Sequence, residues 1–336
     1  IQPACTRLRQ GAVLGPGQAA LAQFLEPILM RNEASRRIFA PHGRFLEAGD
    51  LFKLPQLAET LEALAEQDWR TFYEGSLQQQ MLEQFGPERG GLLTPADFTE
   101  YDVQTFSPLT LAGPNTTLYT MPPPAAGGPM IALMRALYRD GEHAHFSKER
   151  RLCAAMATAD AARLQDRLRP EDYPWAADVY RSRLTGELST PTAPGGPPST
   201  THISVVDAAG NAVGLTFSHG ESNASVIKDT GIMMNNFLGE EDLLPFGLGT
   251  APPAQRLSTM MSPTLLEGED GKIAVMGTGG SNRIRTAIFQ VINRLVDEEM
   301  TPQMAVEAPR LHYEAGILNS ETFGSARMDI LDQIQT

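Results

Sequence analysis

A segment rich in proline and glycine, residues 188–199, divides the 336-residue chain into two parts with different periodicities. Four prolines and two glycines in twelve residues interrupt any helix or central strand, so the segment is expected to be a loop or linker. Before it, apolar residues repeat at helical spacing from Pro55 on, as at Leu57, Leu61, Leu64 and Ala65. After it, residues 202–207 and 212–217 alternate around a turn, which predicts a β-hairpin. The chain is therefore expected to adopt a mixed, layered α/β (α+β) fold.

This segment ends where the first strand of the hairpin is expected to begin, at Ser199 and Thr200. Hydroxyl residues at the start of a strand are commonly strand formers and nothing more. If the Ser199–Thr200 bond were cut, however, Thr200 would carry a free α-amine beside its own hydroxyl. That amine has an ordinary pKa of roughly 7.7–8.0 and can act as the base for Oγ. The sequence therefore allows an ordinary strand start or a nucleophile made by cleavage.

A glycine-rich stretch, residues 277–280, lies between an expected strand at 273–276 and an expected helix at 283–296. It could be a tight turn. A phosphate-binding loop would need the Lys-Ser/Thr ending or the GxGxxG spacing, and neither is present. A third interpretation is an oxyanion hole, in which backbone N–H groups at a helix start approach a tetrahedral intermediate.

Polar residues that could hold a zwitterion follow Thr200 in the sequence. The hydroxyl groups of residues 257–263 could donate to a carboxylate. Asn235 and Asn236, followed by the acids of residues 240–242, could hold an ammonium group. Each pattern alone is weak, because a run of charges is usually a solvated face.

Composition narrows the classes of partner. The net charge is −13 with no Lys/Arg-rich run, which argues against nucleic acid or an anionic membrane. No apolar stretch approaches the roughly 18 residues of a membrane span. Cys5 and Cys153 form neither a metal motif nor a disulfide framework, and His143 and His145 have no further ligand nearby. No cofactor and no metal are expected.

Several motifs in order resemble the γ-glutamyltransferase (γ-glutamyltranspeptidase) family. They are TTHISVVD at 200–207, GNAV at 210–213, TGIMMNN at 230–236, LSTMMSP at 257–263, GGSNRI at 279–284 and APRLH at 308–312. Upstream motifs at 49–50, 55–61, 72–75 and 90–94 resemble the large subunit of the same family. Relative to the family, LSTMMSP contains one extra residue, and so does GGSNRI, where it is Asn282.

The resemblance implies a four-layer αββα sandwich of the N-terminal nucleophile hydrolases and a precursor that cuts itself between Ser199 and Thr200. Thr200 would then attack a γ-glutamyl amide, such as glutathione, and water or an amino acid or peptide acceptor would release the glutamyl group. The implied site residues are the nucleophile Thr200 with Ser218 near its amine, Gly279 and Gly280 as oxyanion donors, Ser258 and Thr259 for the α-carboxylate, and Glu240 for the α-amine. Asn235 is also expected to bind the substrate.

Three departures from the family pattern affect substrate identity. The family's Thr-x-Asn reads Ser218-His219-Gly220 here, the acid is Glu240 in place of Asp, and the second carboxylate-binding Ser is Thr259. A glutaryl-type amide acylase, or an uncleaved homologue that binds without catalysis, therefore remains as an alternative.

The resemblance also implies that the chain is part of a larger precursor, incomplete at both ends. Residues 1–199 would be the later part of the large subunit and residues 200–336 the start of the small subunit, together forming one interleaved domain. The missing N-terminal part would be a partner. Members of the family are commonly exported in bacteria, so a periplasmic or secreted location is expected.

Overall fold

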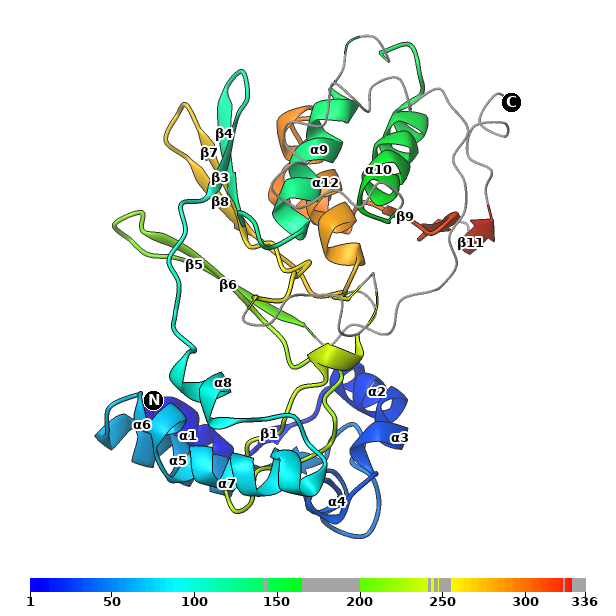
Figure 1. Cartoon of the computed structure of the whole chain (residues 1–336). Coiled ribbons are helices and arrows are strands. Elements are labelled where there is room, and N and C mark those ends of the chain that lie inside the picture. The colour runs from blue at the N-terminus through cyan, green and yellow to red at the C-terminus, as the bar shows by residue number, and fades with distance from the viewer. Residues whose placement is uncertain are drawn as a thin grey trace. The chain divides into compact units, whose positions relative to one another are not determined.

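The computed structural model describes residues 1–139, 141, 144–164, 200–240, 243–244, 247, 255–322 and 324–327. The chain divides into two compact units (Figure 1). The first unit contains Ile1–Thr105 and His219–Asn236, and the second contains Phe106–Ser218 and Phe237–Thr336. None of the described helices is long and apolar enough to cross a membrane.

The first unit is mainly helical. Its helices are α1 (Gln2–Gln10), α2 (Pro16–Phe24), α3 (Glu26–Leu29), α4 (Glu33–Phe39), α5 (Pro55–Glu66), α6 (Thr71–Glu74), α7 (Ser76–Phe85), η1 (Pro87–Arg89) and α8 (Pro95–Thr99). Two short strands, β1 (Ala12–Val13) and β2 (Leu51–Phe52), pair antiparallel. The helix expected from Pro55 is confirmed, and Thr94 with Asp97 forms a capping box at the start of α8.

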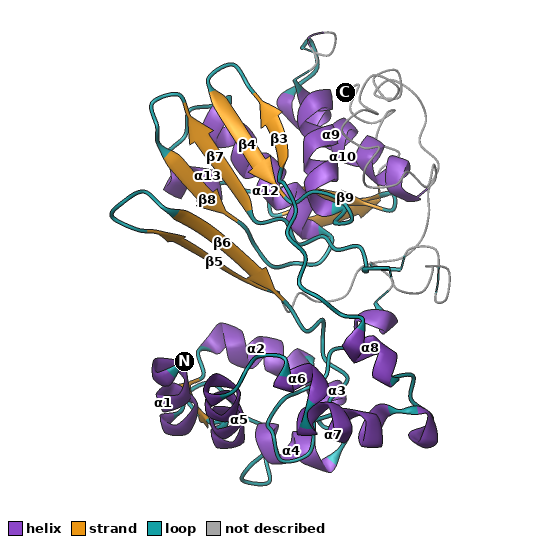
Figure 2. Cartoon of the chain, turned by 60° about the vertical axis from the view of Figure 1, so that its left-hand side comes forward, coloured by secondary structure: helices purple, strands orange, loops and turns teal. Residues whose placement is uncertain are grey.

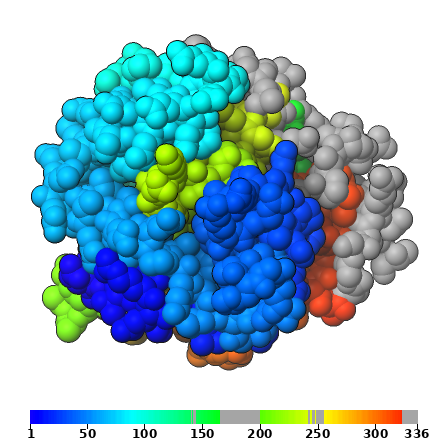
Figure 3. All heavy atoms as spheres, turned by 90° about the horizontal axis from the view of Figure 1, so that it is seen from below, coloured from blue at the N-terminus to red at the C-terminus, as the bar shows by residue number. Residues whose placement is uncertain are grey.

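The segment His219–Asn236 packs among these N-terminal helices although it is distant from them in sequence. Ile227 is fully buried and forms a small core with Met81 and Phe98. The Thr60 hydroxyl donates to the Thr230 carbonyl at 2.9 Å. Figure 3 shows the segment as lime-coloured atoms among the blue and cyan atoms of the N-terminal residues. The sequence patterns did not indicate that this segment packs against the N-terminal helices.

The second unit contains a four-stranded antiparallel sheet in the order β3-β4-β7-β8. The strands are β3 (Leu109–Ala112), β4 (Thr116–Thr120), β7 (Thr264–Gly268) and β8 (Ile273–Met276). Helices α9 (Gly127–Tyr138), α10 (Lys148–Leu164) and α12 (Arg283–Val296) cover one face of this sheet and form the main apolar core with it (Figure 2).

The predicted hairpin is confirmed as β5 (Thr201–Val206) and β6 (Ala212–Phe217), and it lies against the other face of the sheet. Ala274 and Met276 of β8 pack into the helical core. Val275, between them, must point the opposite way, and its side chain lies beside Gly214 of the hairpin. Within this unit the order of layers is therefore helices, sheet, hairpin.

The second unit contains five further described elements. They are η5 (Phe237–Gly239), α13 (Pro302–Glu307), β9 (Leu311–Glu314), β10 (Ile317–Ser320) and β11 (Gly324–Arg327). The last three form an antiparallel sheet in the order β11-β10-β9. Thr301 caps α13 with Pro302 in the first turn, as its sequence predicts.

Candidate functional site

A cavity of about 190 Å³ in the second unit brings together five of the residues singled out from the sequence. They are Thr200, Ser218, Glu240, Ser258 and Thr259. Its other lining residues are Phe237, Leu243, Leu257, Met260, Met261, Ser281 and Ile284. Segments separated by up to about eighty residues therefore contribute polar groups to one small, partly apolar space.

The hairpin register places Thr200 and Ser218 at the same end. Thr201 pairs with Phe217, and the same register carried one residue further sets Thr200 opposite Ser218. Directly opposed residues of an antiparallel pair have Cβ atoms about 4.5–5.5 Å apart. A short polar side chain at Ser218 thus lies beside the residue predicted to be the nucleophile.

The glycine-rich loop before α12 touches Thr200 by direct backbone approach. A Cβ atom built on Gly279 would lie 2.2 Å from the Thr200 carbonyl oxygen and 3.3 Å from its Cβ, so only glycine fits. Gly280 has a φ of +132° and Ser281 a φ of +50°. The loop therefore takes a backbone course that favours glycine and lies against the candidate nucleophile, which the oxyanion interpretation requires.

His202 supports the same loop, although its sequence gave no sign of this role. Its Nδ1 lies 2.7 Å from Thr216 Oγ1 and its Nε2 lies 2.9 Å from Ser204 Oγ. The Ser204 hydroxyl donates to the Val275 carbonyl, so Nε2 is the protonated ring nitrogen. Burial lowers the pKa of His202, which favours this neutral form. A Cβ atom on Gly277 would lie only 2.3 Å from His202 Nδ1, so the ring packs directly on the loop.

The hydroxyl pair at Ser258 and Thr259 is held against the start of α9. The Thr259 carbonyl accepts from Ala126 N and Gly127 N at 2.9 and 3.1 Å. Thr259 Oγ1 accepts from Met261 N at 3.1 Å, which leaves its own O–H able to donate. Ser258 Oγ is buried and has no hydrogen-bond partner among the described residues. A buried donor left in this state is costly, so an acceptor on a ligand would stabilise it.

Glu240 supplies the carboxylate of the cavity, directly after η5. Among the described residues that line the cavity, Glu240 is the acidic one and none is Lys or Arg. The described lining therefore contains no basic side chain that would offset the charge of this carboxylate. Such a site can pair with an ammonium group through Glu240 and can donate to a carboxylate through its hydroxyl groups.

The other sequence candidates fall elsewhere. Asn235 belongs to the first unit, so its predicted role stays a prediction. Asn236, in the same unit, accepts from Glu221 N at 2.9 Å and donates to Glu221 Oε2 at 2.8 Å, which is a structural arrangement. Ser199 and His143 lie outside the described residues. Ser281 lines the cavity and was not selected from the sequence.

Cysteine and metal chemistry find no support in the described part of the chain. Cys5 and Cys153 are buried and unpaired, and burial raises the pKa of Cys153 to about 12. No group of three or more His, Cys, Asp or Glu side chains among the described residues could hold a metal ion.

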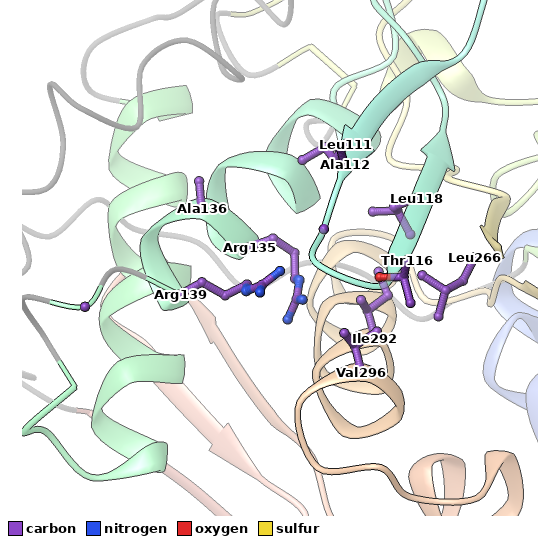
Figure 4. A pocket seen from close by; sticks show the side chains of 12 residues that line it. Leu111, Ala112, Thr116, Leu118, Arg135, Ala136, Arg139, Leu266, Ile292 and Val296 are labelled. Carbon is purple, nitrogen blue, oxygen red and sulfur yellow. The ribbon is translucent and has the colours of Figure 1, made fainter. Parts of the chain in front are cut away.

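A larger cavity of about 430 Å³ lies between the β3–β4 hairpin, α9 and α12 (Figure 4). Arg135 and Arg139 lie on one wall, and Leu111, Leu118 and Ile292 are among the apolar residues. Arg135 bonds to Asp297 and Asn293 of neighbouring segments, so its charge is compensated within the fold. This cavity contains none of the predicted site residues, and the smaller cavity is the better candidate.

Comparisons with known proteins give one family. The family model described as gamma-glutamyltranspeptidase matches residues 1–335. The glutathione hydrolase proenzyme of Pseudomonas aeruginosa is 31% identical over 310 residues, covering 82% of this chain and 55% of that protein. The glutathione hydrolase proenzyme of Escherichia coli K12 is 28% identical, covering 94% of this chain and 60% of its own length. The acylase ACY 1 proenzyme of Pseudomonas sp. V22 is also 28% identical, and the match covers 96% of this chain and 61% of that protein.

Among solved structures, a cephalosporin acylase from Bacillus halodurans superposes with a TM-score of 0.78 at 22% identity. The match covers 95% of this chain and 63% of that one. This likeness shows the fold and confirms the predicted α+β sandwich. The chain spans between 55% and 61% of the length of the three curated relatives described above.

Proposed function

Because this chain belongs to the gamma-glutamyltranspeptidase family, we propose that its protein cuts itself between Ser199 and Thr200 and then transfers or hydrolyses γ-glutamyl groups. The observation that carries the proposal is the single cavity lined by Thr200, Ser218, Glu240, Ser258 and Thr259. A nucleophile, an acid for an ammonium group and hydroxyl donors for a carboxylate are the groups that a γ-glutamyl amide requires.

In the proposed reaction, Thr200 Oγ attacks the carbonyl carbon of the γ-amide while its proton passes to the freed α-amine of Thr200. The developing negative charge on the carbonyl oxygen would be stabilised by N–H groups of Gly279 and Gly280. The carbon–nitrogen bond then breaks, and the leaving amine departs with the proton. The product of this step is a γ-glutamyl ester on Thr200. Ser218 would lie beside the α-amine.

The ester is released by water or by the amine of an acceptor amino acid or peptide. The attacking group loses its proton to the Thr200 amine, and that proton returns to Thr200 Oγ as the ester bond breaks. Hydrolysis gives glutamate, and transfer gives a new γ-glutamyl amide. Glutathione is the donor that the names of the curated relatives suggest.

The size and charge of the cavity favour a γ-glutamyl head group. At about 190 Å³ it is smaller than the roughly 300–1,000 Å³ of sites for drug-sized ligands. It would therefore hold the small acyl part of the substrate and leave the amine part outside. Glutaryl and γ-glutamyl groups share the same chain length and carboxylate, but only the second has an ammonium group for Glu240.

The first test is cleavage. Intact-mass measurement of the full-length protein should show two chains, with the second beginning at Thr200. Thr200→Ala should remain uncut, Thr200→Ser should still be cut, and Thr201→Ala should be cut like the wild type, because that hydroxyl starts β5 and lies outside the cavity. A wild-type chain that stays intact after long incubation would contradict the proposal and favour an uncleaved binding protein.

The second test is substrate choice. Cleaved protein should release p-nitroaniline from γ-glutamyl-p-nitroanilide faster than from glutaryl-p-nitroanilide. Turnover of the glutaryl compound alone would reassign the protein as an acylase, the activity named for the ACY 1 relative. Adding glycylglycine and measuring γ-glutamyl-glycylglycine would separate transfer from hydrolysis.

For location we propose the periplasm or the cell exterior. The support is the family resemblance, and the small number of cysteines is compatible with it. Fractionation of cells that express the full-length gene, with an antibody against this chain, tests the assignment.

A further inference from the structure

A buried polar network surrounds Asn282, the residue that lengthens the GGSNRI motif. Asn282 is 4% exposed, and it contacts charged residues of α10, α12 and β9. Its Oδ1 accepts from Arg285 at 2.8 Å and from Arg163 at 3.1 Å, and its Nδ2 donates to Glu314. One small amide side chain thus joins three elements that surround the end of the glycine-rich loop.

Asn282 does this instead of capping its own helix. An Asn at the N-cap position normally accepts from the backbone N–H groups of the first turn. In α12 the Asn282 side chain makes no such bond. The first turn is closed by the loop itself, because Arg283 N donates to the Gly280 carbonyl and Ile284 N to the Ser281 carbonyl.

The charges of the network balance one another. Arg285 pairs with Asp160 at 3.0 Å, and both side chains are almost fully buried. Glu314 offsets Arg163. Burial opposes ionisation of Glu314, but His312 and the nearby guanidinium groups outweigh it and lower its pKa. Paired buried charges of this kind hold a fixed geometry, because moving any member leaves another one uncompensated.

The loop that precedes Asn282 needs such an anchor. Gly280 and Ser281 both have positive φ, and for Ser281 this conformation persists only where the surroundings enforce it. Gly279, two residues before Ser281, lies against Thr200 with no room for a side chain. Asn282 therefore fixes the C-terminal end of the loop whose other end touches the nucleophile.

We propose that Asn282 is a positioning residue, which, through its bonds to Arg163, Arg285 and Glu314, holds Gly279 and Gly280 in place beside Thr200. This inference rests on the proposed function for its catalytic consequence. It differs from a purely structural role because losing Asn282 should loosen this loop more than the rest of the second unit.

The test compares two buried asparagines of the same stretch of chain. Asn282→Ala removes the anchor. Asn293→Ala is the matched control, because Asn293 is equally buried in α12 and bonds to an arginine, Arg135, away from the cavity. Asn282→Asp keeps the size and the acceptor for Arg163 and Arg285 but replaces the donor to Glu314 by an acceptor oxygen, and it serves where the alanine variant does not fold.

With γ-glutamyl-p-nitroanilide, Asn282→Ala should lower kcat by about 10- to 100-fold with KM within about threefold, below the 10²–10³ that loss of a whole oxyanion donor costs. The kcat of Asn282→Asp should lie between those of Asn282→Ala and the wild type. Asn293→Ala should keep kcat within about threefold of the wild-type value, even if its Tm drops as far as that of Asn282→Ala. Equal kcat losses in the two alanine variants would overturn the proposal.

Hydrogen exchange tests the same idea without activity. The peptide that contains residues 277–282 should exchange faster in Asn282→Ala than in Asn293→Ala or the wild type. Unchanged exchange there would refute the anchoring role even in an active enzyme. If the wild type has no γ-glutamyl activity but this peptide still exchanges faster in Asn282→Ala than in the wild type, the anchoring role is supported and the proposed function is rejected.

Discussion

A single methyl group at Gly279 should disable the site without unfolding the protein. In Gly279→Ala the new Cβ would lie 2.2 Å from the Thr200 carbonyl oxygen, whereas ordinary contact begins near 3.4 Å. The loop or the start of β5 must therefore move by roughly 1 Å. A misplacement of this size in a catalytic arrangement can cost about 10²-fold in rate. We expect kcat for γ-glutamyl-p-nitroanilide to fall about 100-fold.

The assay needs a control for the general effect of replacing glycine by alanine. Gly17 in α2 has no atom within 4 Å of a built Cβ and no positive φ, so Gly17→Ala should keep full activity and gain up to about 1 kcal/mol of stability. Both variants should show the wild-type circular dichroism spectrum and be cut at Thr200. A cleaved Gly279→Ala protein with kcat within threefold of wild type would refute the view that this contact sets the catalytic geometry.

Three further predictions concern substrate recognition and stability. Glu240→Gln should raise KM for γ-glutamyl-p-nitroanilide about 10- to 100-fold, the loss of one charge-assisted hydrogen bond, and leave glutaryl turnover unchanged or faster. An equal loss on both substrates would contradict the ammonium-binding role. Ser258→Ala should raise KM about tenfold with a Tm at or above wild type, because its buried hydroxyl lacks a partner among the described residues. Ser262→Ala is the matched control and should lose about 1 kcal/mol, because Ser262 Oγ donates to the Met260 carbonyl at 2.8 Å. Burial lowers the pKa of His312, so the unfolded chain takes up a proton near pH 6.5 where the folded protein does not. Stability should therefore be complete above about pH 6.5 and fall as the pH drops toward the folded pKa, and urea midpoints from pH 7.5 to 5 should fall less steeply in His312→Gln.

Local patterns predicted the elements that carry the site. Alternation around a turn specified the hairpin β5–β6, because a strand with one covered face shows a period of two. The helix expected directly after the glycine-rich stretch is α12, with the expected bounds Arg283–Val296. The motifs also named five residues that the structure brings to one cavity.

The supporting contacts could not be predicted in the same way. The small residues Ala155, Ala159 and Ala162 of α10 are spaced for close packing on one face, and all three are fully buried. Asp160 lies between Ala159 and Ala162 in sequence and Arg163 follows directly after, and charged residues in a helix are usually on a solvated face. Here they are buried because Asp160 pairs with Arg285 of α12 and Arg163 donates to Asn282, and these partners lie more than a hundred residues away in the sequence. Pairwise compensation of this kind leaves no periodic signal.

The question of substrate reduces to one charge. Within the second unit, Gly279 fixes the loop on Thr200, Gly277 fixes it on His202, and the Thr259 backbone is tied to the start of α9. These contacts would position the proposed nucleophile and hydroxyl donors, which a γ-glutamyl and a glutaryl group would use alike. Glu240 is the acidic group among the described lining residues. In the proposed function, it alone would distinguish an acyl chain that carries an ammonium from one that does not. Its one extra methylene relative to the family's Asp moves the carboxylate without removing its charge. A preference for γ-glutamyl donors should therefore depend on the charge of residue 240, and Glu240→Asp should retain it while Glu240→Gln loses it.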